Sequence, residues 1–352
     1  MVVHSVPKQA CLTTVAAAPF TTTRQLRPMI TSLPSSAGGG LGHSMDSFSF
    51  RAATQKDNKV VIVIGATGTG KSRLSLDLAA NFPAEIINSD KMQVYKGLDV
   101  VTNKVTDEER AGIPHHLLGV VDPDEDFTAA DFRRRTATIV ESILGRRRLP
   151  IIAGGSNSYI EALVNGCNYE CCFLWVDVAL PVLHSFVSER VEKMVAVGLV
   201  EEVRGMFRQD GDYSHGIRRA IGVPEMDRYF REEMSADGAA RERLLKEAIE
   251  EIKENTRKLA CCQLQKIRRL ARSGWEVHRL DATEVFRRRG AAADDAWDRL
   301  VAAPGVEIVR RFLCESEEAV LRGQSTAVGN CSVKATMGAA MAAAVAVAGS
   351  SR

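Results

Sequence analysis

The chain has 352 residues, of which 45% are hydrophobic and 26% are charged, with a formal net charge of +2. This composition is typical of a globular protein and excludes collagen-like, coiled-coil and wholly disordered chains. The longest apolar stretch near the C-terminus, residues 337–349, is shorter than the roughly 20 residues that a helix needs to cross a bilayer, so we expect no membrane anchor.

The first 50 residues differ from the rest in composition and charge. They are rich in Ser, Thr and Ala and have no acidic residue before Asp46. This pattern is typical of an organelle transit peptide. We predict that residues 1–55 form a disordered chloroplast (plastid) transit segment. The cytoplasm and the mitochondrion are the alternative locations. At the other end, residues 315–352 are rich in Ala, Ser and Gly and are predicted to be a disordered tail.

Beyond residue 50, basic and acidic side chains are equal in number. A neutral body provides no general electrostatic attraction for a nucleic acid, although local basic runs such as residues 133–135 could still meet phosphates. Such runs are more often solvated helix faces. We therefore expect no stable nucleic-acid partner.

Four short strands are predicted in the first half of the chain. Residues 60–64 are all β-branched, which predicts a strand buried on both faces, as in a parallel sheet. Further strands are predicted at residues 85–88, 149–153 and 173–178, with helical stretches between them. This alternation predicts an α/β fold, a doubly wound parallel sheet flanked by helices, with its core at residues 56–180.

The strongest motif directly follows the first predicted strand and matches G-x-x-x-x-G-K-[ST]. Its glycines let backbone N–H groups surround phosphate oxygens, and the start of the next helix adds partial positive charge. The lysine supplies a point charge, and the final hydroxyl can hold Mg²⁺. A P-loop NTPase-like fold with a di- or triphosphate site is therefore predicted, formed by Gly65, Ala66, Thr67, Gly68, Thr69, Gly70, Lys71 and Ser72.

The second half of the chain has a helical pattern. No strand pattern occurs between residues 181 and 274, and one stripe of side chains recurs there at spacings of three and four. We expect a helical insertion at residues 181–250, then a long helix and a return to the core at 251–314, with one more strand at 275–280. The stripe, predicted to pack on the core, comprises Leu245, Ile249, Ile252, Thr256, Leu259, Gln263, Ile267 and Leu270.

Two carboxylates stand at strand ends near the phosphate loop. Asp177 ends the fourth predicted strand, where a small-molecule kinase or NTPase would place the acid that organises Mg²⁺. Asp90 follows the second strand and would lie at the same edge of the sheet as the loop. A carboxylate beside a diphosphate can be a metal ligand or a general base, so the residues alone leave both roles open.

A series of further motifs, in order, resembles the isopentenyltransferases that prenylate N6 of adenine. The resemblance spans about residues 59–282 and is far more specific than the phosphate loop by itself. Its motifs lie at residues 87–99, 102–104, 113–117, 127–132, 152–163, 219–225 and 256–260.

This resemblance implies that the phosphate loop holds the diphosphate of dimethylallyl diphosphate and that adenine is the acceptor. Asp90 would take the proton of the N6 amino group as N6 attacks the allylic carbon. Lys71, Arg219, the loop amides and Mg²⁺ on Ser72 would meet the charge of the departing diphosphate. Arg218 is interpreted as a solvated neighbour and Asp177 as a structural acid.

Other positions are implied with less support. Lys104 borders the donor site in this family, and Ser156 and Asn157 follow two glycines at a strand end, where they contact substrate or cap the next helix. Arg257 and Lys258 are expected to project from the long helix toward acceptor phosphates. The adjacent histidines at 115 and 116 are expected to pack in a loop, because adjacent histidines rarely bind one metal ion.

Two branches of the family differ in their acceptor. Eukaryotic enzymes that act on transfer RNA commonly add a Cys₂His₂ finger after the long helix, and bacterial ones carry Gly-Gly-Thr-Gly-Leu-Tyr where this chain has Gly-Gly-Ser-Asn-Ser-Tyr at 154–159. The chain instead resembles the plant adenylate isopentenyltransferases of cytokinin synthesis, which implies ADP, ATP or AMP as acceptor. A transfer RNA dimethylallyltransferase and a P-loop kinase or NTPase are the alternatives. The sequence does not specify the oligomeric state.

Overall fold

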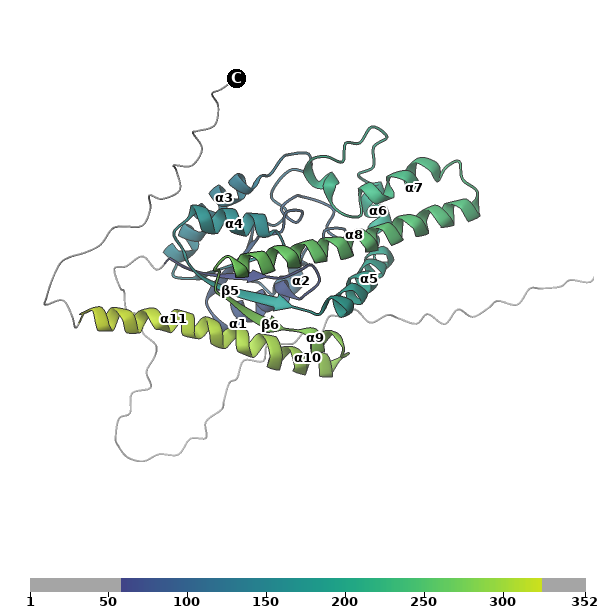
Figure 1. The fold of residues 1–352 in the computed structure, drawn as a ribbon. Coiled ribbons are helices and arrows are strands. Elements are labelled where there is room, and N and C mark those ends of the chain that lie inside the picture. The colour runs from purple at the N-terminus through teal and green to yellow at the C-terminus, as the bar shows by residue number, and fades with distance from the viewer. Residues whose placement is uncertain (1–57, 325–352) are drawn as a thin grey trace, which may run out of the picture. The chain divides into compact units, whose positions relative to one another are not determined.

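The structure, a computed structural model, describes the backbone of residues 58–324 and the side chains of residues 58–314 (Figure 1). The predicted transit segment at 1–55 lies outside the described residues. The tail predicted from residue 315 is wrong at its start, because helix α11 runs from Ala303 to Gln324. Residues 315–324 contain three Glu together with single Ala, Leu, Arg and Gln residues, all of which favour helix. Residues 325–352 lie outside the described part.

A parallel sheet forms the centre of the described chain, as predicted. Its strand order is β3-β2-β4-β1-β5-β6, and all neighbouring strands are parallel. The four predicted core strands and the predicted return strand are all present. Strand β3 was not predicted, because it has only two residues. The strands are β1 (Lys59–Ile64), β2 (Ala84–Asn88), β3 (His115–His116), β4 (Leu149–Ala153), β5 (Glu170–Asp177) and β6 (Val277–Asp281).

Helices cover both faces of the sheet (Figure 1). Alternate residues of β1 pack against the helices on the two faces. Val60, Ile62 and Ile64 share one core with α3, α4 and α8, whereas Val61 and Val63 share another with α1 and α11. A strand buried on both faces needs apolar side chains at every position. These helices are α1 (Lys71–Asn81), α3 (Ala129–Gly145), α4 (Asn157–Gly166), α8 (Gly238–Arg272) and α11 (Ala303–Gln324).

The region after β5 is helical, as predicted. The boundary expected at residue 250 falls inside α8, which starts at Gly238 because Asp237 caps it by accepting a hydrogen bond from the N–H of Ala240. Of the predicted stripe, Ile252, Thr256, Gln263, Ile267 and Leu270 are buried. The other elements are α5 (Leu180–Ala196), α6 (Leu199–Arg204), η1 (Gly216–Arg219), η2 (Pro224–Met226) and α7 (Asp227–Glu232).

The remaining helices are short or terminal. A two-turn segment, α10 (Ala291–Trp297), continues through η3 (Asp298–Ala302) into α11, and Trp297 is buried there. The indole N–H of Trp297 donates a hydrogen bond to Asp77 of α1. Two more short helices are α2 (Asp107–Arg110) and α9 (Thr283–Phe286). No helix within residues 58–324 is long and apolar enough to span a membrane.

Candidate active site

A cavity of about 660 Å³ opens where β1, β2 and β4 end. Ligands of open α/β sheets bind at the carboxyl ends of the strands, so the cavity lies where this fold places a site. It is lined by the phosphate loop, the turn at Asp90, residues 101–103 and 105, the loop after β4, and side chains of α5 and α8. Ser72, Asp90, Arg219, Ser156, Asn157 and Lys71 all line it, so the structure brings together most of the predicted site residues.

The phosphate loop has the backbone shape that its sequence predicts. Gly68 and Gly70 have φ values of 83° and 96°, which glycine adopts at little cost. A side chain at Gly70 would also collide with the ring of Trp297, which lies 2.7 Å from where its Cβ would be. Trp297 of α10 therefore packs directly against the phosphate loop. Helix α1 starts at Lys71, at the end of the loop.

Two cations of the cavity come from different elements. Lys71 Nζ donates a hydrogen bond to the carbonyl of Ala66, 2.8 Å away. Arg190 of α5 donates from Nη2 to Thr67 Oγ1 in the same loop, 2.9 Å away. Burial lowers the pKa of Lys71 to about 8, Asp90 opposes this shift, and Arg190 adds to it. The sequence did not point to Arg190, because nothing in a helical stretch shows that one arginine reaches a loop 123 positions away.

Asp90 is oriented by its own turn. Its Oδ1 accepts hydrogen bonds from the N–H groups of Met92 and Gln93, at 2.9 and 3.4 Å, and its own N–H donates to Asn88 Oδ1. Within the described residues, Oδ2 accepts no hydrogen bond. One carboxylate oxygen is thus fixed by the backbone, and the other is available to a ligand in the cavity.

The two glycines after β4 are each required because a side chain would collide with a different neighbour. A Cβ on Gly154 would lie 2.6 Å from the backbone nitrogen of Asp90, and one on Gly155 would lie 2.4 Å from Gln263 Nε2. Ser156 Oγ accepts a hydrogen bond from the N–H of Lys91, 2.8 Å away. This edge of the cavity is therefore packed directly against the turn that carries Asp90.

One side chain of α8 joins the two loops. Gln263 Oε1 accepts from the N–H of Thr67 at 2.7 Å, and its Nε2 donates to the carbonyl of Gly155 at 3.0 Å. Asn157 Nδ2 donates to the carbonyl of Gln263 at 3.1 Å. The sequence placed Gln263 on the packing stripe of the long helix, and the structure shows in addition that its amide bridges the site.

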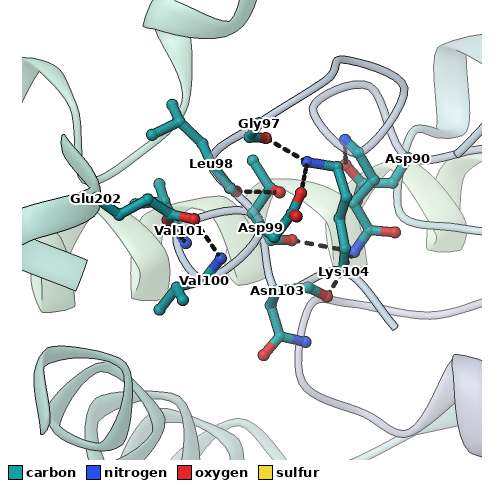
Figure 2. Close-up of polar contacts among 11 residues, drawn as sticks. Asp90, Gly97, Leu98, Asp99, Val100, Val101, Asn103, Lys104 and Glu202 are labelled. Carbon is teal, nitrogen blue, oxygen red and sulfur yellow. Dashed lines mark hydrogen bonds and ion pairs between the residues drawn. The ribbon is translucent and has the colours of Figure 1, made fainter. Parts of the chain in front are cut away.

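Lys104 does not line the cavity but holds one of its walls together (Figure 2). Its ammonium group donates to the carbonyl of Gly97 and pairs with Asp99 at 2.8 Å, and its side chain is only 6% exposed. The resulting loop presents residues 101–103 to the cavity. Lys104 therefore shapes the wall from behind.

The same loop is tied to α6 and to the Asp90 turn (Figure 2). Glu202 of α6 accepts the N–H groups of Val100 and Val101 with its two oxygens, at 3.0 and 2.8 Å. Gln93 Nε2 donates to the carbonyls of residues 102 and 103. These contacts fix the wall formed by residues 101–103 relative to the carboxylate.

The two arginines of η1 have different surroundings. Arg219 lines the cavity and donates to the Gly216 carbonyl at 3.3 Å. The interpretation of Arg218 as solvated is wrong, because its side chain is 7% exposed and pairs with Asp124 at 3.1 Å. The backbone of η1 buries one of the two adjacent arginines and leaves the other facing the cavity.

Arg257 and Lys258 lie outside the cavity. Arg257 donates to Ser188 Oγ at 3.0 Å, and Lys258 pairs with Glu254 at 2.8 Å. Both line a smaller surface depression beside the thiol of Cys261, which lies 3.3 Å from His184 Nε2. Their predicted contact with acceptor phosphates stays a prediction.

Asp177 and the two histidines have structural partners. Asp177 is buried and accepts from Arg279 Nε of β6 at 2.7 Å, as expected for a structural acid. His116 Nε2 lies 2.7 Å from Glu85 Oε2. Among the described residues, no group of three or more His, Cys, Asp or Glu side chains is arranged to hold a metal ion.

Comparison with known proteins agrees with this geometry. The IPP transferase family model matches residues 93–170 and 165–270. Adenylate isopentenyltransferase 5 of Arabidopsis thaliana, described as chloroplastic, is 61% identical over 298 residues, which cover 82% of this chain and 90% of that protein. The chain belongs to the isopentenyltransferase family. The adenylate isopentenyltransferase of Humulus lupulus is 45% identical and covers 72% of this chain and 90% of its own length. The resemblance inferred from the motifs is confirmed.

Solved structures of isopentenyltransferases share the fold. A eukaryotic dimethylallyltransferase acting on tRNA aligns with a TM-score of 0.64 and 23% identity, over 73% of this chain and 80% of that one. The tRNA isopentenylpyrophosphate transferase of Bacillus halodurans aligns with a TM-score of 0.61 and 24% identity, over 76% and 99%. The predicted fold class is confirmed by these neighbours and by the sheet.

The bridge made by Gln263 in this isopentenyltransferase can be tested by Gln263→Leu. We expect the free energy of unfolding to fall by about 1–3 kcal/mol, because the N–H of Thr67 and the carbonyl of Gly155 lose their partner. Denaturant unfolding measures this change. Gln265→Leu, at an exposed position of the same helix, is the matched control and should change stability by no more than about 0.5 kcal/mol. Equal stability of the two variants would contradict the bridge.

Proposed function

We propose that the protein is an adenylate isopentenyltransferase. It transfers a dimethylallyl group from dimethylallyl diphosphate to N6 of ADP or ATP, or of AMP, releases diphosphate, and serves cytokinin biosynthesis. The named relatives support this reaction, and so does one observation: among the described residues, Asp90 is the one carboxylate that lines the cavity together with the phosphate loop. That arrangement suits proton removal opposite a departing diphosphate.

The chemistry needs one bond to form as another breaks. N6 of adenine attacks C1 of the donor, the C1–O bond breaks, and both electrons leave with the diphosphate. The N6 proton passes to Asp90 Oδ2, while the N–H groups of Met92 and Gln93 hold Oδ1 in place. Because the positive charge on N6 is removed as it develops, the base lowers the barrier to the attack.

The developing charge on the diphosphate has to be stabilised by groups already in place. Lys71, the amides of the phosphate loop and Arg219 line the cavity and supply this positive potential. Lys71 donates one hydrogen bond to the carbonyl of Ala66, and the other two donors of its ammonium group can serve a phosphate oxygen.

The residues present also suit Mg²⁺. Ser72 is exposed toward the cavity, and Mg²⁺ is commonly bound through one or two protein oxygens together with substrate phosphates. When bound there, Mg²⁺ would neutralise part of the diphosphate charge. The Ser72 hydroxyl at the start of α1 would hold it.

The kinase alternative lacks its acid. A P-loop kinase or NTPase would use the carboxylate at the end of β5, but Asp177 is paired with Arg279 and does not line the cavity. The transfer RNA alternative shares the fold and the donor chemistry and differs only in the acceptor, so it is separated by assay.

The activity is tested by incubating the protein with dimethylallyl diphosphate and either ADP, ATP, AMP or unmodified transfer RNA. We expect prenylated ADP and ATP to be detected by mass, with none formed on transfer RNA. Chelation of Mg²⁺ should abolish turnover, and added Mg²⁺ should restore it. Prenylation confined to transfer RNA would replace the proposed acceptor. Phosphate release from ATP without any prenyl donor would support the kinase.

The role of Asp90 is tested by Asp90→Asn. Turnover should fall by about 100-fold or more, because the amide cannot take the N6 proton. Pyrophosphate affinity, measured by calorimetric titration, should stay nearly intact. Asp107→Asn, at an exposed position of α2 whose side chain is 92% exposed, is the control and should retain full turnover. Normal turnover of Asp90→Asn would remove this residue from the mechanism.

We further propose a plastid location. Relatives at 61% and 57% identity are described as chloroplastic and one at 54% as mitochondrial, and the first 55 residues have a transit-like composition. A fusion of residues 1–55 to a fluorescent reporter should enter plastids of plant cells. Diffuse cytosolic or mitochondrial fluorescence would contradict the plastid assignment.

A further inference from the structure

We infer that Arg190 is a further catalytic residue, which contacts the diphosphate of the donor from α5 and stabilises it as it leaves. This inference rests on the proposed function, because it assigns a second cation to the same leaving group. Nothing in the phosphate-loop motif points to it, since α5 begins more than 100 positions further along the chain.

The hydrogen bonds of Arg190 are incomplete. A guanidinium has five N–H donors, and the one side-chain contact of Arg190 in the described residues is from Nη2 to Thr67 Oγ1 at 2.9 Å. Its Nε is buried and has no hydrogen-bond partner. A buried donor without a partner is costly, and such a group is commonly explained by a missing ligand or water. Arg190 lines the cavity, so a phosphate oxygen there would accept hydrogen bonds from the guanidinium donors that Thr67 does not use.

The charges around Arg190 are also unbalanced. Within the described residues, neither Arg190 nor Lys71 forms an ion pair with a carboxylate within 4.0 Å, and Asp90 is the carboxylate whose field acts on both. Both cations line the cavity, and the positive charge of Arg190 helps to lower the pKa of Lys71. An entering diphosphate would remove this repulsion. Its several negative charges therefore match the site better than a single carboxylate would.

The neighbours of Arg190 on α5 indicate the class of diphosphate. Val191 and Met194, the next residue and the one a turn later, line the same cavity, and Ile252 and Leu259 of α8 line it too. A cation next to apolar side chains suits a ligand with a charged head and a hydrocarbon tail. An allylic diphosphate has this form, because a hydrocarbon chain is attached to its charged group. In ATP the group attached to the triphosphate is a polar sugar that carries a base.

The test uses Arg190→Gln and Arg190→Lys in the full chain. Calorimetric titration with pyrophosphate in the presence of Mg²⁺ should show affinity about 10- to 100-fold weaker for Arg190→Gln, the range expected for charge-assisted hydrogen bonds. Steady-state kinetics with dimethylallyl diphosphate should show both a higher KM and a lower kcat, because the contact strengthens as charge develops. Arg190→Lys should recover part of both losses by restoring the charge without the planar fork.

Two comparisons separate this contact from a structural role. Lys193→Gln removes a cation from an exposed position of the same helix and should leave binding and turnover unchanged. Thr67→Val removes the hydrogen bond to Arg190 but keeps its charge, so it should weaken pyrophosphate binding less than Arg190→Gln does. If Thr67→Val weakens binding as much, or if Lys193→Gln does, the contact is overturned.

The result is distinguishable from failure of the proposed function. If the wild-type protein transfers the prenyl group and Arg190→Gln keeps normal KM, kcat and thermal stability, the inference fails while the function stands. If the wild-type protein binds pyrophosphate and Arg190→Gln does not, but no prenylated product forms, the diphosphate contact stands while the function fails.

Discussion

Uncompensated positive charge at the end of a parallel sheet is the constraint on which the rest of this site depends. Lys71 and Arg190 face a cavity in which Asp90 is the carboxylate that acts on both. Burial makes such charges costly, so they persist only where the surrounding chain holds them rigidly. A bound diphosphate would offset the cost of burying these two positive charges. In the proposed reaction, the same diphosphate is the leaving group that these charges stabilise.

The rigidity comes from segments far apart in the sequence. Gln263 of α8 binds both the phosphate loop and the loop after β4, and Trp297 packs under the phosphate loop. Glu202 and Lys104 hold the wall at residues 97–104. Each contact fixes backbone rather than ligand, so the cavity keeps its shape before a substrate arrives, which is what electrostatic stabilisation requires.

The sheet was predictable from sequence because strands buried on both faces are continuous apolar runs, as in residues 60–64. Strand β3 was not predicted because its two histidines form no apolar run. The end of α11, up to Gln324, was not predicted because residues 315–352 were judged by their overall Ala- and Ser-rich composition, although the first ten include good helix formers. The phosphate loop and Asp90 were found because their motifs are local.

Arg190 and the bridging role of Gln263 could not be found in that way. A helical stripe shows which side chains face inward, but it does not show which of them reach a loop formed elsewhere in the chain. Lys104 illustrates the opposite case. The motif placed Lys104 at the border of the donor site, but its ammonium group binds Gly97 and Asp99, and Lys104 does not line the cavity.

Gly154 and Gly155 set a limit on how proteins of this design can diverge. Any β-carbon at either position would meet the Asp90 turn or the Gln263 amide, so this side of the pocket is closed to substitution. The wall at residues 101–103 is held through main-chain atoms, through the buried side chain of Val101 and through the Thr102 hydroxyl, which donates to the carbonyl of Leu98. Of these three residues Asn103 is the exposed one, and its φ of 52° favours Asn or Gly, so this wall also leaves little room for substitution.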